Sequence, residues 1–313
     1  MKKKSWLIFA YFCLFLNVSA QRNLSAISLV PQKSAAVLRV NWTQVRGNEK
    51  LRAIVNGDNF EKIENELGVS GAKISEWIIF SDINPSTSAG MGIIISGSFT
   101  SNSVIQTAKA KNWKAEKMGA NTVFVNPSDK SYLLPIRNGL LVFGTKSGVE
   151  KLHGVLVKPQ NNLISKPPFN STWAELTASR QPINFMIGVP QEYQKVADIA
   201  YKVAAKLMDL ASFGIMGTVM ETIGLVRCMG FSISHQKNVY PTNLVAMMET
   251  ETKAWLTSGA INLLKKAPSA IGTRAKTEEE KQMLKSMQTM SASYRGTLLS
   301  VKFDMPENAL RQR

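Results

Sequence analysis

The hydrophobic and polar positions of this chain follow one plan twice. Residues 35–41 form a mostly apolar run that predicts a strand; helical spacing up to Leu67-Gly68 then precedes two strand-like runs, 74–81 and 90–97. The order strand, helix, strand, strand, helix, strand is that of a ferredoxin-like unit. Because the second half has the same order, the sequence predicts an α+β fold of two related ferredoxin-like (βαββαβ) units, with antiparallel sheets and helices packed on one face.

The second half begins with a strand predicted over residues 183–189. In residues 191–210 the charged side chains keep to one side and the apolar ones to the other at a 3.6-residue period, which predicts a long amphipathic helix. A shorter helical piece ends at Ile223-Gly224, as the earlier one ends at Leu67-Gly68. Further elements are expected beyond it: strands over 227–235 and 240–248, a helix capped by Thr250 or Thr252, a helix from 277 to 290, and a last strand over 294–304.

Two runs in the first half, 77–80 and 91–95, are almost continuously apolar. Such runs are typical of central strands that are covered on both faces, or by helices on one face and a neighbour on the other. The remaining elements of this half are predicted to be a helix capped by Ser101, three short strands, and a closing helix over 147–157.

Composition places the boundaries between these parts. The predicted division is a signal peptide (1–20), a linker (21–33), a first α+β unit (34–158), a second linker (159–181), a second α+β unit (182–305) and a polar tail (306–313). Residues 159–181 are predicted to be a linker because they are rich in proline and asparagine and show little periodicity.

The N-terminus predicts export. Three lysines precede an eleven-residue apolar run, 6–16, and Val18-Ser19-Ala20 has the small residues that a signal peptidase recognises. The run is shorter than the ~20 residues that a membrane-spanning helix needs. We therefore expect cleavage after Ala20, a periplasmic or secreted protein, and no integral membrane segment in the mature chain.

Cleavage changes the charge and the cysteine count. The mature chain has 293 residues, with 35 basic and 22 acidic side chains, a net charge of about +13. Its basic residues form no long run, so the expected partners are an unknown protein, a lipid or an anionic polymer, and export argues against nucleic acid. Cys228 is the one remaining cysteine, which excludes an intramolecular disulfide; its strand-like surroundings predict a small buried hydrophobe.

Three stretches carry a resemblance to a known group. The run 35–41, the strand 77–82 and the helix entry Pro190-Gln191-Glu192-Tyr193 resemble exported bacterial proteins of a domain-of-unknown-function family with duplicated α+β units. The resemblance covers most of the mature chain and includes no catalytic motif. It implies a bacterial envelope setting and no particular activity.

Histidines are the first test for catalysis, and the chain has two, His153 and His235. Neither has a second histidine, a cysteine or a carboxylate at metal-ligand spacing, so a surface or capping role is favoured. A Ser-His-Asp triad stays open, since its members can be distant in sequence. The glycines near Lys146 lack the spacing of a phosphate-binding loop, and no catalytic residue is predicted.

Methionine is the unusual residue of the second half. Met283, Met287 and Met290 fall on one helical stripe. Soft thioether sulfur selects copper(I), so a copper site is one hypothesis; packing in the core is the favoured interpretation, and a groove for an acyl chain or an apolar peptide is a third. No metal site and no cofactor are predicted.

These patterns favour a non-enzymatic protein. We expect an exported, soluble binding or scaffolding protein of the bacterial envelope whose ligand the sequence does not identify. The alternatives are an envelope hydrolase with dispersed catalytic residues, in which His153 or His235 meets a serine or carboxylate, and a carrier of lipid or another hydrophobic ligand, which needs a large apolar cavity.

Overall fold

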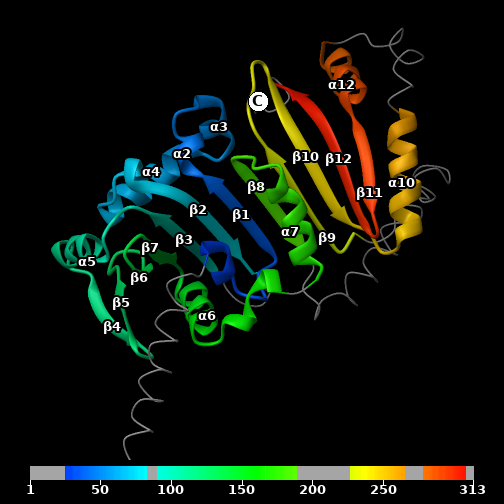
Figure 1. Cartoon of the computed structure of the whole chain (residues 1–313). Coiled ribbons are helices and arrows are strands. Elements are labelled where there is room, and N and C mark those ends of the chain that lie inside the picture. The colour runs from blue at the N-terminus through cyan, green and yellow to red at the C-terminus, as the bar shows by residue number, and fades with distance from the viewer. Residues whose placement is uncertain (1–24, 83–89, 166, 189–225, 265–277, 308–313) are drawn as a thin grey trace, which may run out of the picture.

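The computed structural model describes residues 25–82, 90–165, 167–188, 226–264 and 278–307 (Figure 1). The predicted signal peptide, the amphipathic helix 191–210, the helical piece ending at Ile223-Gly224, the cap Thr277 and most of the predicted tail lie outside these residues. Within the described parts of the chain, no helix is long and apolar enough to cross a membrane.

The described residues build a 12-stranded sheet in which every pair of neighbours is antiparallel. The strands lie in the order β11-β12-β10-β9-β8-β1-β2-β3-β7-β6-β5-β4, and Figure 1 shows the sheet running from β4 at one end to β11 at the other. Their bounds are β1 Ala36–Asn41, β2 Ile74–Ser81, β3 Met91–Gly97, β4 Lys114–Met118, β5 Asn121–Val125, β6 Tyr132–Arg137, β7 Leu140–Gly144, β8 Ile183–Gly188, β9 Cys228–Ile233, β10 Val239–Met247, β11 Ser291–Arg295 and β12 Leu298–Pro306.

The two predicted units share this sheet. Strand β1, from the first half, pairs with β2 on one side and with β8, from the second half, on the other, so that Val40 lies between Trp77 and Ile183. A ferredoxin-like unit needs parallel strands joined by a helical crossover. Here β1, β2 and β3 are successive antiparallel neighbours, so the α+β class is confirmed and the duplicated ferredoxin-like units are not.

Helices flank the sheet and form its two main cores. The structure contains α2 Trp42–Val45, α3 Glu49–Ile54, α4 Gly57–Leu67, α5 Ser101–Ala110, α6 Lys146–Val157, α7 Phe169–Ala178, α10 Glu251–Leu264 and α12 Glu278–Thr289, with 3-10 turns η1 Ala26–Leu29, η2 Gly71–Lys73, η3 Pro159–Asn161 and η4 Leu163–Ser165. Successive strand residues point to opposite faces, so Trp77 enters the core under α2 to α5, and Ile78 enters the core under α6 and α7.

The prediction that helices pack on only one face of the sheet was therefore wrong for the first half. Trp77 and Ile78 are both fully buried, as are Ile94 and Ile95 in the next strand. The continuous apolar character of these strands already pointed to cover on both faces, and the structure confirms it. Helix α4 ends at Gly68, whose positive φ of 63° is that of the predicted C-terminal cap.

Both predicted linkers contain structure. Residues 159–181 hold α7, whose Phe169, Trp173 and Leu176 are buried against β8, β9 and β10. In the predicted linker 21–33, Leu29 and Val30 are buried in the same core. Both stretches contain proline and asparagine, and their buried apolar residues are too few to show a period.

Other boundaries differ locally from the prediction. Strand β4 was not predicted, the last strand is a hairpin of β11 and β12 that turns at Gly296 (φ 58°), and the first helical stretch divides into α2 and α3. Thr100, rather than Ser101, caps α5, because its hydroxyl accepts a hydrogen bond from the Ser103 N–H. Of the two caps predicted for α10, Thr250 accepts the bond, from the Lys253 N–H.

Candidate functional site

An open pocket of about 690 Å³ lies between α4 and the end of the sheet that carries β5 to β7. Its volume is within the range of small-molecule sites, roughly 300–1,000 Å³. We call it the α4 pocket and define it by its lining residues: Lys62, Ile63, Glu66, Lys111, Trp113, Asn126, Ser128, Asp129 and Phe143.

Glu66 is the centre of the polar wall. One carboxylate oxygen accepts a hydrogen bond from Lys111 Nζ at 3.2 Å, and the other accepts one from Asn126 Nδ2 at 3.4 Å. Lys111 Nζ also donates to the backbone carbonyls of Asn65 and Glu66, which are among the last of α4. Lys111 thus satisfies free carbonyls at the end of the helix, and the same Nζ fixes the Glu66 carboxylate.

The opposite wall is the turn between β5 and β6. Asn126 is buried, and its Oδ1 accepts a hydrogen bond from the Ser128 N–H at 3.0 Å. Asp129 Oδ1 accepts hydrogen bonds from both the N–H and the hydroxyl of Ser131. These side chain to backbone bonds are typical of Asx turns, and they hold Ser128 and Asp129 on the pocket lining.

Two aromatic residues form the apolar part of the pocket. Trp113 follows α5 and is brought inward by Asn112, whose φ of 59° turns the chain sharply. The ring centroids of Trp113 and Phe143 are 6.4 Å apart and the planes are tilted by 34°, within the usual range of an aromatic pair. Phe143 is half-buried, so part of its ring is available to a ligand.

A second open pocket, of about 540 Å³, lies beside α6 and combines apolar residues with Lys33, Lys151 and Lys158. Lys151 is engaged in an ion pair with the buried Asp82. Neither pocket described here is the large apolar cavity that a lipid carrier needs, since charged side chains line both.

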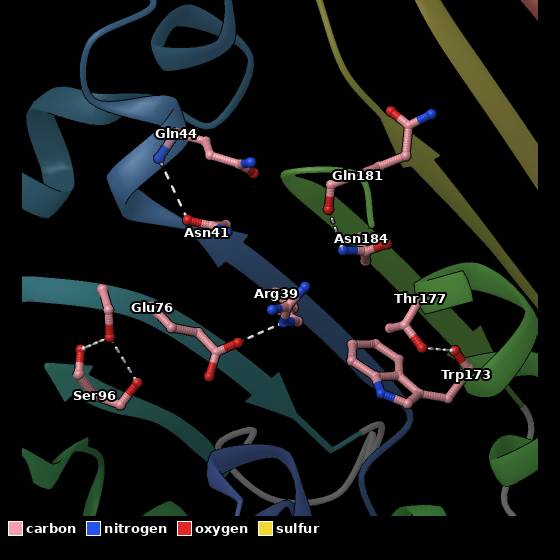
Figure 2. A network of polar contacts seen from close by, with 10 residues as sticks. Arg39, Asn41, Gln44, Glu76, Ser96, Trp173, Thr177, Gln181 and Asn184 are labelled. Atoms are coloured by element: carbon pink, nitrogen blue, oxygen red, sulfur yellow. Dashed lines mark hydrogen bonds and ion pairs between the residues drawn. The ribbon is translucent and has the colours of Figure 1, made fainter. Parts of the chain in front are cut away.

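A row of polar side chains crosses the sheet on the face of α6 and α7, shown in part in Figure 2. The Arg39 Nε–H donates to Glu76 at 2.5 Å, and Arg39 lies opposite Asn184 across the β1–β8 pairing. We call this set the polar row, and its members are Ser96, Glu76, Arg39, Asn184, Ser232 and Asn243. Neighbouring members are directly opposed cross-strand pairs, except that Glu76 and Arg39 meet diagonally because Arg39 lies opposite Ile78.

The polar row marks the junction of the two halves. Asn184 is fully buried, and its Nδ2 donates to the Gln181 backbone carbonyl at 2.9 Å (Figure 2). A one-residue slip of β8 along β1 would move Asn184 into the opposite, apolar core, which is costly for an amide. The polar row therefore specifies the register of the central strands, and we assign it a structural role.

The structure places the two histidines in different parts of the fold, His153 in α6 and His235 between β9 and β10. His153 lies in α6, half-buried against Gly119. His235 stacks on Tyr240 with ring centroids 5.0 Å apart, and its Nδ1 lies 3.4 Å from Asn48 Nδ2. Asn48 Oδ1 accepts the Leu51 N–H, which directs the Asn48 NH₂ group towards Nδ1 of the ring. Within the described ranges, neither histidine forms a hydrogen bond or an ion pair with a serine or a carboxylate.

The sulfur residues of the second half lie in different elements. Met283 and Met287 belong to α12, and Met290 follows the helix, with its N–H bonded to the Met287 carbonyl. Cys228 is buried, and this burial raises the pKa of its thiol to about 12, so it is a packed, unreactive side chain as predicted. Over the described part of the chain, no group of three His, Cys, Asp or Glu side chains is placed to hold a metal ion.

Comparisons with known proteins add no functional assignment. No family model matches the chain, and no curated protein matches it. Among solved structures, crystal form IV of TP0453 matches with a TM-score of 0.49 and 11% identity over 93% of this chain and 96% of that one. Crystal form III matches with a TM-score of 0.47 and 11% identity over 92% and 97%. At these values the likeness indicates nothing about what this chain binds.

Sequence reasoning missed the α4 pocket because its residues come from four separate stretches. The signals that were present are local: a turn rich in Asn, Ser and Asp after a strand, and a tryptophan after a helix end. Nothing in the sequence indicates that α4 lies across from that turn.

Proposed function

We propose that this chain is an exported, non-enzymatic binding protein of the bacterial envelope and that its ligand enters the α4 pocket. The observation that supports binding is the preorganised wall: Glu66 is held by Lys111 and by Asn126, which is in turn held by a backbone N–H. Side chains fixed in this way lose little conformational freedom when a ligand arrives. Export and the envelope setting rest on the N-terminal sequence and on the family resemblance.

A binding role accounts for the pocket better than catalysis does. A general acid or base needs a proton-accepting group within hydrogen-bond reach of a reacting atom, and a nucleophile needs an adjacent base. Glu66 is already engaged on both oxygens, Lys111 is engaged at the end of α4, and both histidines lie outside the α4 pocket. The pocket has the features of a recognition site rather than of a reaction centre.

Native mass spectrometry of the chain purified from its own host tests this proposal. The wild-type chain is expected to carry a bound mass that denaturation releases. Lys62→Trp, at an exposed position on the pocket rim, obstructs the α4 pocket with an indole ring and is expected to abolish the bound mass. Lys109→Trp, at an exposed position of α5 outside the pocket, is the matched control and is expected to retain it.

Two results of the same experiment would contradict the proposal. A bound mass that survives Lys62→Trp places the ligand elsewhere on the chain, and a wild-type chain without bound mass removes the support for a tightly held ligand. The spectrum also reports the N-terminus, because cleavage after Ala20 leaves a chain that begins at Gln21.

A further inference from the structure

The charges of the α4 pocket cancel. Lys62 and Lys111 contribute two positive charges, and Glu66 and Asp129 contribute two negative ones, although the chain as a whole carries a net charge of +16. A pocket for an anion would exploit the basic excess by placing unpaired lysines or arginines on its lining. The nearly neutral lining instead suits a ligand without net charge.

The hydrogen-bonding capacity left over in the wall is balanced as well. Lys62 makes no ion pair within the described ranges, and the Ser128 hydroxyl has no hydrogen-bond partner there, so both can donate. The second oxygen of Asp129 and the remaining lone pairs of Glu66 can accept. Donors and acceptors side by side match hydroxyl groups, since each hydroxyl gives one hydrogen bond and accepts others.

The aromatic floor adds the third feature. The half-buried Phe143 ring, backed by Trp113, presents an apolar surface beneath the polar wall. A sugar ring has hydroxyls around its rim and C–H groups on its faces, so it can satisfy a polar wall and an aromatic floor at once. A simple aliphatic ligand would leave the polar groups of the wall without hydrogen-bond partners, which disfavours its binding.

We propose that the ligand of the α4 pocket is an uncharged, hydroxyl-rich molecule of the saccharide class. This inference rests on the proposed binding function and specifies its ligand. Glu66, Asp129, Lys62 and Ser128 bind the hydroxyls, and Phe143 packs against a ring face. A peptide or an anionic polymer is the competing ligand class that the experiment separates.

The test is isothermal titration of the chain purified from its host with three neutral tetrasaccharides, maltotetraose, cellotetraose and chitotetraose, and with the anionic tetragalacturonate. At least one neutral tetrasaccharide is expected to bind, and more tightly than tetragalacturonate. Phe143→Leu keeps an apolar side chain and removes the ring; it is expected to weaken binding about fivefold. Phe231→Leu changes an equally half-buried phenylalanine far from the pocket and leaves binding unchanged.

Ser128→Ala isolates one polar contact. It removes the hydroxyl and keeps the backbone N–H that bonds Asn126, so the turn is preserved. The loss of one ligand hydrogen bond is expected to weaken binding by about three- to tenfold. Ser98→Ala, which removes another exposed hydroxyl outside the pocket, is the control.

Each other outcome overturns the inference. Binding that the two pocket variants leave intact places the saccharide elsewhere, and tighter binding of tetragalacturonate makes the ligand anionic. If no neutral tetrasaccharide binds while the co-purified mass is still lost in Lys62→Trp, the binding function stands and the ligand class is wrong. If the co-purified mass is also absent, both proposals fail together.

Discussion

Strands β2 and β3 in the first half differ sharply from β8 and β9 in the second, although all four belong to one sheet. In β2, the neighbours Trp77 and Ile78 point to opposite faces and both are fully buried. In β8 and β9, Met186 and Cys228 are buried on the face covered by α7, while Phe185 and Phe231 on the other face are only half-buried, with ring centroids 5.2 Å apart.

The two edge strands of the sheet are protected by different means. The β4 edge is exposed and carries alternating charges in Lys114, Glu116 and Lys117, which discourage the docking of a further strand. At the β11 edge, Asn262 of α10 bonds both backbone groups of Ala292: the Ala292 N–H donates to Asn262 Oδ1 at 2.9 Å, and Asn262 Nδ2 donates to the Ala292 carbonyl at 2.8 Å. The sheet is protected by charge at one edge and by an amide that substitutes for a strand at the other.

This comparison shows that β2 and β3 are more completely buried than β8 and β9 among the residues that the structure describes. The first half has helices on both faces, and the α4 pocket is built on it. A frame that is buried on both sides keeps the walls of a pocket in place, whereas the half-buried aromatic face of β8 and β9 contributes less to stability per side chain.

Among substitutions that test the difference in burial between the two halves, Trp77→Ala is expected to have the largest effect on stability. Trp77 packs edge-on against Phe60 at 4.9 Å and against Trp42 at 6.2 Å between ring centroids. Its loss is expected to lower the free energy of unfolding by about 3–5 kcal/mol, measured by urea denaturation. Phe231→Ala is the matched change in the second half, and because that ring is half-exposed, we expect a loss of only about 1–2 kcal/mol. Equal losses would show that the two regions do not differ.

A smaller effect is expected at the β11 edge. Asn262→Ala removes both hydrogen bonds to Ala292 and is expected to cost about 1 kcal/mol. Asn262→Asp still accepts from the Ala292 N–H but cannot donate to its carbonyl, so its cost falls between wild type and alanine. Hydrogen exchange of the Ala292 amide reports the edge directly. Unchanged exchange in Asn262→Ala would mean that the amide does not protect this edge.

The smallest effect concerns Glu64, in the helix layer over β2. Burial raises the pKa of its carboxyl above the ordinary 4.5, the Glu61 charge raises it further, and the Trp42 side chain, the Gly71 N–H and Arg46 partly oppose the shift. The charged form is therefore disfavoured in the folded state, and stability is gained as the pH falls through the folded pKa towards 4.5.

Glu64→Gln removes this dependence. We expect the variant to be more stable than wild type at pH 7 by less than about 0.5 kcal/mol, since solvent screens a half-exposed carboxyl, and the difference to vanish below pH 4.5. Thermal unfolding at pH 4 and pH 7 measures it, with the exposed Glu49→Gln of α3 as control. A stabilisation that is independent of pH would assign the effect to packing.

Local chemistry was sufficient for the positions of most strands and helices. The apolar runs of β1, β2, β3, β8, β9 and β10 were predicted to within one or two residues, because a strand of alternating or continuous apolar residues is legible in a short window. The end of α4 was predicted from Gly68, since only a residue that tolerates positive φ ends a helix in this way. Strand β4 escaped because its side chains are almost all exposed and polar.

The sequence by itself thus determined most of the strands and helices, their order and the α+β class. Only the tertiary structure decided that β1 pairs with β8, that one sheet joins both halves, and that Glu66 meets Asn126 across 60 positions of sequence. The physical reason is that the periodicity of apolar residues shows which side of a helix or strand is buried but does not show which element packs against that side. The choice of neighbour depends on packing and hydrogen bonds between residues that are distant along the chain, and the α4 pocket exists only through that choice.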